Sequence, residues 1–289
     1  MARAGSGVAG SAAVRLALFA AVLTVVAAVA ALAGSVSGVG AAEASPDAMG
    51  HGSSERGEGM PSGISDVSGG YRLQITPTTL GAGKPTPLAV RITDADGVPV
   101  TELDEAQGEP SLHLILVRRD LTGYQHLHPE RRGDRFGTTA TLPEPGVWRA
   151  YADFEVDGEK VVLGRDLLVP GEFAPRALPQ PASAVEVDGY ALALAHGPLR
   201  AEREARLTFS VARGGERVEL EPYLGADGHL VAIREDDLTY LHVHPRAAAA
   251  PGVIAFDAEF EQAGAYALFV QFKHGGTVRT GRFTVEVAR

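Results

Sequence analysis

The feature that most constrains this chain is an internal repeat of about one hundred residues. The segment from Leu112 to Pro129, LHLILVRRDLTGYQHLHP, returns as His229 to Pro245, HLVAIREDDLTYLHVHP. The flanking stretches recur as well, because YADFEVDGEKVVLGRDLLV is matched by FVQFKHGGTVRTGRFTVEV. A repeat of this period is one structural unit. We therefore expect two tandem copies of one domain.

Short apolar runs of alternating polarity fill each copy, among them YRLQIT, PLAVRIT and VWRAYADF. Turn sequences such as Asp96-Gly97 and Pro145-Gly146 separate the runs, and no amphipathic helix pattern is present. This texture predicts an all-β fold of two tandem antiparallel immunoglobulin-like β-sandwiches after an N-terminal apolar helix. Alternation predicts inward-facing residues on one strand of each copy: Trp148, Ala150, Ala152 and Phe154, then Tyr266, Leu268, Val270 and Phe272.

Composition also predicts the domain boundaries. Residues 1–41 are expected to be a signal peptide or N-terminal membrane anchor, because Arg3 and Arg15 precede the apolar run Leu16–Ala33 and small residues ending at Ala41. Cleavage and retention both stay open, since the run reaches the length of a spanning helix. Either way the rest of the chain is expected outside the cytoplasm, secreted or anchored to the cell membrane. The remaining expected parts are a disordered linker at 42–70, a sandwich at 71–170, a Pro-rich linker at 171–184 and a second sandwich at 185–289.

Composition argues against several functional classes. A formal net charge of -10 argues against a nucleic-acid partner. The chain has no cysteine, which excludes disulfides, thiolate nucleophiles and zinc or copper sites built on thiolate. All three methionines, Met1, Met49 and Met60, precede the repeats, so thioether copper ligation within them is excluded. No nucleophile elbow, phosphate loop, dinucleotide fingerprint or HExxH motif occurs. We therefore expect no enzyme and no organic cofactor.

Six of the nine histidines fall in the repeat at matching intervals. His126 and His128 lie thirteen and fifteen residues after His113, and the second copy repeats both intervals. If each segment is a hairpin symmetric about its turn, His126 faces Ile115 and the three imidazoles share one face. Nitrogen donors grouped in this way suit Cu(II) or Zn(II). The expected metal ligands are one set in each domain: His113, His126 and His128, and His229, His242 and His244.

A structural role would account for the same histidines. The predicted histidine face also carries Ile115, Val117, Tyr124 and their counterparts, so the rings can equally belong to a packed core. Two functions therefore stay open. The first is an exported binding protein for a divalent transition metal, copper in the first place, acting as an extracytoplasmic buffer or metallochaperone. The second is a non-metal module that binds another envelope protein, with structural histidines and with membrane contact only through an uncleaved N-terminal helix.

The chain resembles exported bacterial proteins with small immunoglobulin-like domains, the YtkA-like and FixH-like families. The matching residues are His113, Asp120-Leu121 and HLHP, then His229, Asp237-Leu238 and HVHP. The resemblance covers roughly Tyr71 to Val287 and implies heavy-metal or copper handling outside the cytoplasm. YLHVHP is also similar to a strand of copper, zinc superoxide dismutases. That family needs further histidines, an aspartate and a disulfide, whereas only His274 follows His244 here.

Overall fold

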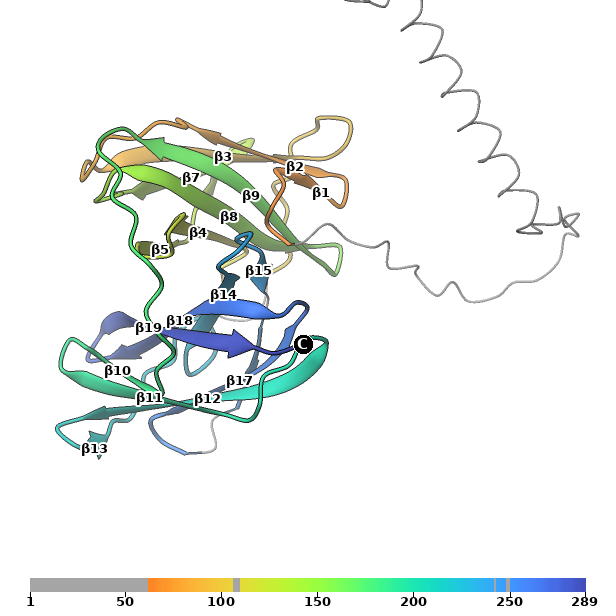
Figure 1. The fold of residues 1–289 in the computed structure, drawn as a ribbon. Helices are drawn as coiled ribbons and strands as arrows, with labels where there is room; N and C mark the ends of the chain where they lie inside the picture. The colour runs from red at the N-terminus through yellow and green to blue at the C-terminus, as the bar shows by residue number, and fades with distance from the viewer. Residues whose placement is uncertain (1–61, 106–109, 242, 248–249) are drawn as a thin grey trace, which may run out of the picture. The chain divides into compact units, whose positions relative to one another are not determined.

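The computed structural model describes residues 62–105, 110–241, 243–247 and 250–289 (Figure 1). Every regular element in these ranges is a β-strand, so the predicted all-β class is confirmed. A helix long and apolar enough to cross a membrane is not found among these residues. The predicted leader at 1–41 lies outside the described residues.

The first repeat is a pair of antiparallel sheets. One sheet has the order β1 (Val67–Ser68), β2 (Tyr71–Thr76), β3 (Thr86–Thr93), β7 (Arg135–Ala140) and β6 (Glu130–Arg132). The other has the order β5 (Tyr124–Leu127), β4 (Leu112–Arg118), β8 (Gly146–Val156) and β9 (Glu159–Val169). The residues predicted to face inward on β8, from Trp148 to Phe154, are all buried in the core of this repeat, as expected.

The second repeat has the same strand order. Its first sheet runs β10 (Ala184–Val187), β11 (Tyr190–His196), β12 (Arg203–Arg213), β17 (Val253–Phe260) and β16 (His244–Arg246), with β13 (Glu216–Arg217) paired to β12. Its second sheet runs β15 (Tyr240–Leu241), β14 (His229–Arg234), β18 (Gly264–His274) and β19 (Thr277–Val287). The alternate residues of β18, from Tyr266 to Phe272, are buried in its core. The chain therefore consists of two tandem sandwiches of one topology (Figure 1).

The described part of the expected N-terminal linker differs from the prediction. Residues 62–70 were expected to be disordered, but β1 pairs with β2 and the Gly164 amide donates to the Ser65 carbonyl at 2.7 Å. The buried guanidinium of Arg149 donates to the carbonyls of Gly63 and Ile64. Backbone hydrogen bonds and one arginine side chain hold this segment in place. Such contacts do not depend on apolar side chains in the segment, so its polar composition did not indicate order. The Pro-rich linker was predicted at 171–184; residues 171–183 contain no strand, and β10 begins at Ala184.

A third apolar cluster joins the β4 sheet of the first repeat to the β14 sheet of the second. It contains Ile115, Val117 and Tyr151 from the first repeat, and Val231, Ile233 and Phe269 among those from the second. Side chains alternate along a strand, so these residues point away from the core of their own sandwich. The apolar faces that carry the repeated histidines therefore pack on each other.

The turns after β4 and β14 strengthen this contact. Leu121 and Leu238 have φ of 58° and 63°, a conformation that costs a residue with a Cβ about 1–2 kcal/mol, and both side chains are buried in the shared cluster. Arg282 of the second repeat donates to the Leu121 carbonyl at 2.8 Å, and Tyr151 of the first donates to the Leu238 carbonyl at 2.7 Å. Each repeat thus hydrogen-bonds the turn of the other.

Candidate metal centre

The hairpin formed by β4 and β5 brings two histidines together. Ile115 pairs with His126 and Leu114 with Leu127, which confirms the predicted register. His113 and His126 consequently lie on the hairpin face that is turned away from the first core. Nδ1 of His113 is 2.8 Å from Nε2 of His126, and the His113 side chain is buried.

His128 follows directly after the end of β5 and adds a third ring. Its Nε2 lies 3.2 Å from Nε2 of His126, and the two ring centroids are 4.6 Å apart. The predicted set His113, His126 and His128 is therefore one cluster in the structure, with His126 at its centre.

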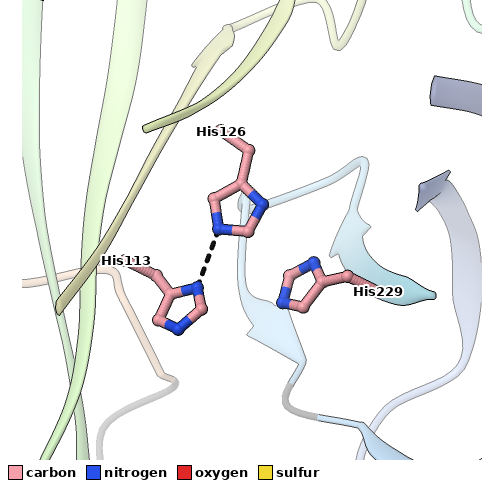
Figure 2. A group of neighbouring side chains, drawn as sticks. All are labelled: His113, His126 and His229. Atoms are coloured by element: carbon pink, nitrogen blue, oxygen red, sulfur yellow. Dashed lines mark hydrogen bonds between the residues drawn. The ribbon is translucent and has the colours of Figure 1, made fainter. Parts of the chain in front are cut away.

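The second repeat contributes His229 to this cluster. The His229 ring, at the start of β14, is 4.4 Å from the His126 ring and 5.5 Å from the His113 ring, measured between centroids. One ring nitrogen each of His113, His126 and His229 lie within 4.8 Å of one another, and Figure 2 shows the three rings converging. The cluster thus draws on both repeats.

This grouping differs from the expected one, in which His229 belonged with His242 and His244. His244 is exposed and begins β16, which pairs with β17 in the other sheet of the second repeat. His242 lies outside the described residues. In the first repeat the equivalent strand, β6, begins at Glu130, which is two residues later in the repeat than the start of β16. His128 therefore precedes β6 and lies in the cluster, whereas its counterpart His244 lies in the sheet that contains β16 and β17.

Gln271 orients the central ring from the second repeat. It stands opposite His229 on β18, and its Oε1 is 2.7 Å from Nδ1 of His126. Its Nε2 donates to Thr280 Oγ1 at 3.2 Å, so the amide oxygen is the atom that faces His126. An amide oxygen only accepts, so His126 carries its proton on Nδ1 and directs the lone pair of Nε2 into the cluster.

Burial favours the neutral form of His126 and of His128. It lowers the pKa of His126 well below its ordinary value, and the imidazoles of His229 and His113 lower it further, whereas the hydrogen bond that His126 donates to Gln271 raises it. Burial, followed by the His113 imidazole, lowers the pKa of His128 to about 4. Neutral imidazole is the form that binds a metal ion.

Gln271 was missed by sequence reasoning. Its position opposite His229 depends on the pairing of β14 with β18, which joins residues far apart in the sequence. Glutamine carries no metal-ligand signal of its own, so no local motif marks it. The two strands recur in the repeat, and that recurrence is the one sequence feature from which the pairing could have been proposed.

The nitrogen spacing fits one hydrogen bond at His126 Nε2 and also lies near the spacing of two ligands on one metal ion. Nε2 of His126 has a single lone pair, so it accepts a proton from His113 or from His128 and not from both. Two nitrogens bound to one zinc or copper ion at about 2.0–2.1 Å and a tetrahedral angle stand about 3.3 Å apart. The observed separations of 2.8 Å and 3.2 Å are close to that value. A cation at this point would engage several lone pairs at once.

No curated protein matches this chain in sequence. Among solved structures it is similar to the Escherichia coli adhesin FdeC, at 17% identity over 76% of this chain and 64% of that one, with a TM-score of 0.27. Yersinia pseudotuberculosis InvD matches at 15% identity over 75% of this chain and 57% of that one, with a TM-score of 0.26. A DUF4426 family protein of Pseudomonas aeruginosa matches at 10% identity over 37% of this chain and 97% of that one, with a TM-score of 0.30.

A family model described as "Domain of unknown function (DUF8832)" matches the chain twice, at residues 65–169 and at residues 185–289. Each match spans one sandwich, from the first sheet to the last strand. The chain therefore belongs to the DUF8832 family and contains two copies of its domain.

Proposed function

We propose that this protein binds one divalent transition-metal ion, Cu(II) or Zn(II), at a centre shared by its two repeats. The observation that carries the proposal is the convergence of one nitrogen each from His113, His126 and His229 within 4.8 Å. His128 offers a fourth nitrogen beside His126. The proposed stoichiometry is one ion per chain, in place of one per repeat.

The chemistry of the donors supports this choice of metal. The proposed ligands are all imidazoles, which suit Cu(II) and Zn(II), and affinity for such sites generally rises toward Cu(II). Two nitrogens bound to one ion can be at most about 4.2 Å apart. Since the three nitrogens are separated by up to 4.8 Å, the most widely separated pair has to close by up to about 0.6 Å on binding. Gln271 already fixes the His126 ring in the tautomer that a metal requires.

The cellular role that we propose is an extracytoplasmic metal buffer or metallochaperone, with copper as the first candidate. The proposal of export rests on the leader-like composition of residues 1–41. The resemblance to the YtkA-like and FixH-like families, carried by His113, Asp120-Leu121 and HLHP with their second-copy counterparts, supports metal handling outside the cytoplasm.

A structural role for the histidines is the second candidate. The observation that favours it is the hydrogen-bond chain from His113 through His126 to Gln271, which links the two repeats without a metal. In that case the protein is a rigid tandem module for binding another envelope protein.

Titration calorimetry of Cu(II) and Zn(II) into the purified protein separates these candidates. We expect one ion per chain, with binding weakened strongly by His126→Ala and by His229→Ala. His244→Ala is the matched control, because it removes an exposed repeat histidine outside the cluster, and binding should persist. Two ions per chain, one of them lost in His244→Ala, would contradict the shared centre. Wild-type binding no tighter than that of His126→Ala, together with a lower melting temperature of His126→Ala, would favour the structural role.

A further inference from the structure

A cavity of about 220 Å³ connects the histidine cluster with the surface of the protein. His113 and His229 line it, together with the buried side chains of Asp153 and Tyr240. Exposed residues, including Asp104, line it as well. The cavity therefore extends from the proposed metal ligands to solvent.

The walls of this cavity are acidic. Among the described residues, four carboxyl groups line it, against the one amine of Lys160; they belong to Asp104, Glu105, Asp153 and Glu155. Asp104 is fixed in place, because its carboxylate accepts a hydrogen bond from the Gly158 amide at 2.8 Å and its own amide donates to the Glu155 carbonyl at 2.8 Å. Charges of one sign along a low-dielectric cleft focus the field and concentrate counterions. Here the field attracts cations.

The other described sides of the cluster favour the entry of a cation less. His128 lines a second hollow, but that hollow carries Arg132 and Arg135 against the carboxylate of Glu130. Gln271 is 5% exposed and occupies the Nδ1 side of His126. Beyond the β4 and β14 histidines, the apolar cluster that contains Ile115 and Val231 fills the space between the two sheets. A charged ion does not cross such packed apolar groups at low cost.

We propose that the acidic cavity is the path by which a divalent cation enters and leaves the histidine cluster, and that its carboxylates set the rate of capture. The inference rests on the proposed metal-binding function. Six water molecules, the usual shell of a divalent cation, occupy roughly 180 Å³ at the density of the liquid. The volume of the cavity, about 220 Å³, exceeds this figure, and in the proposed path the ion exchanges its water there for imidazole nitrogen.

This path makes the centre an exchangeable one. A ligand from a chelator or an acceptor protein reaches the ion through the same opening, on the side lined by His113 and His229. Capture should be fast and should slow as salt screens the carboxylates, since the Debye length falls from about 30 Å at 0.01 M to about 10 Å at 0.1 M.

Stopped-flow mixing with Zn(II), followed with a chromogenic indicator for the free ion, tests the path. The mouth variant is Glu105→Gln with Glu155→Gln. The control is Glu204→Gln with Glu259→Gln, because these two exposed carboxylates face each other across β12 and β17, away from the cavity, and give the same change in net charge. At low salt we expect the capture rate constant to fall about tenfold in the mouth variant and less than twofold in the control.

A second variant, Ala226→Trp, narrows the cavity with an uncharged side chain. We expect it to slow capture and chelator-driven release in parallel and to leave the equilibrium affinity nearly unchanged. Capture rates equal in the mouth variant and its control, with release unaffected by Ala226→Trp, would overturn the path but leave a metal centre that depends on His126. Failure of the wild type to bind Zn(II) or Cu(II) would instead overturn the proposed function.

Discussion

Replacing Gln271 with leucine tests whether the second repeat orients the ligands of the first. The Gln271 side chain is buried and accepts the Nδ1 proton of His126 at 2.7 Å. Leucine has a similar volume and no acceptor, so Gln271→Leu removes the hydrogen bond without opening a large void. His126 then loses the contact that fixes its ring orientation and its tautomer.

The expected magnitude follows from this single contact. Hydrogen-bond partners of metal-bound histidines typically contribute about 10–100-fold to metal affinity, or about 1.4–2.7 kcal/mol. The metal-free protein should be weakened too, because the change leaves a buried N–H without an acceptor at a cost of about 1–3 kcal/mol. Both effects come from one atom pair, Gln271 Oε1 and His126 Nδ1.

Competition with a chelator of known affinity measures the first effect, and denaturant unfolding without metal measures the second. Thr280→Val is the control, because it removes the other hydrogen bond of Gln271, at 3.2 Å, and leaves the His126 contact in place. Its Cu(II) affinity should stay within about threefold of wild type, below the tenfold lower bound for the lost contact. Wild-type Cu(II) affinity in Gln271→Leu would refute the reasoning, and so would an equal loss in Thr280→Val.

Three further predictions concern stability. The pKa values of His126 and His128 are lowered on folding, so between pH 6.5 and about 4 the unfolded chain binds protons that the folded protein does not. The free energy of unfolding should therefore fall as pH falls through this window, and His128→Ala should flatten the profile measured by urea denaturation. A Cβ on Gly164 would lie 1.7 Å from the Gly63 carbonyl oxygen, so Gly164→Ala should lower the free energy of unfolding, measured with denaturant, by about 1–3 kcal/mol or more. Gly197 has open space around it, so Gly197→Ala should lower it by less than about 1 kcal/mol. The Tyr124 hydroxyl is buried without a partner among the described residues, so Tyr124→Phe should raise the melting temperature. Tyr151→Phe loses the hydrogen bond to the Leu238 carbonyl and should lower the melting temperature.

Local periodicity was enough to predict the sandwiches and one hairpin of the site. Alternating apolar residues placed Trp148 and Phe154 in the first core, and the polar turn after Arg118 placed His126 opposite Ile115. The core positions and the hairpin register depend on residues that are close in sequence or on one face of a strand. An alternating pattern of period two indicates both.

The relation between the repeats could not be predicted in the same way. His229 joins His113 and His126 because two sheets from different sandwiches pack face to face, and no spacing within one copy encodes that contact. One sign was present. All seven residues of β4, Leu112–Arg118, are buried, and its run LHLILV is apolar on both faces. A strand in a sheet that is covered on one side only alternates, so a continuous apolar run indicates a second covering layer.

Divergence between the two copies accompanies the formation of one histidine cluster from a repeated motif. Asp153 stands opposite His113 and Gln271 opposite His229, so the two occupy corresponding positions in the repeats. Each serves the other repeat, because Tyr240 donates to Asp153 at 2.8 Å and Gln271 accepts from His126. A neutral amide at this position accepts the Nδ1 proton of His126 and orients the ring without adding a charge. The two repeats therefore use one position differently: the acid of the first repeat binds Tyr240, and the amide of the second orients His126.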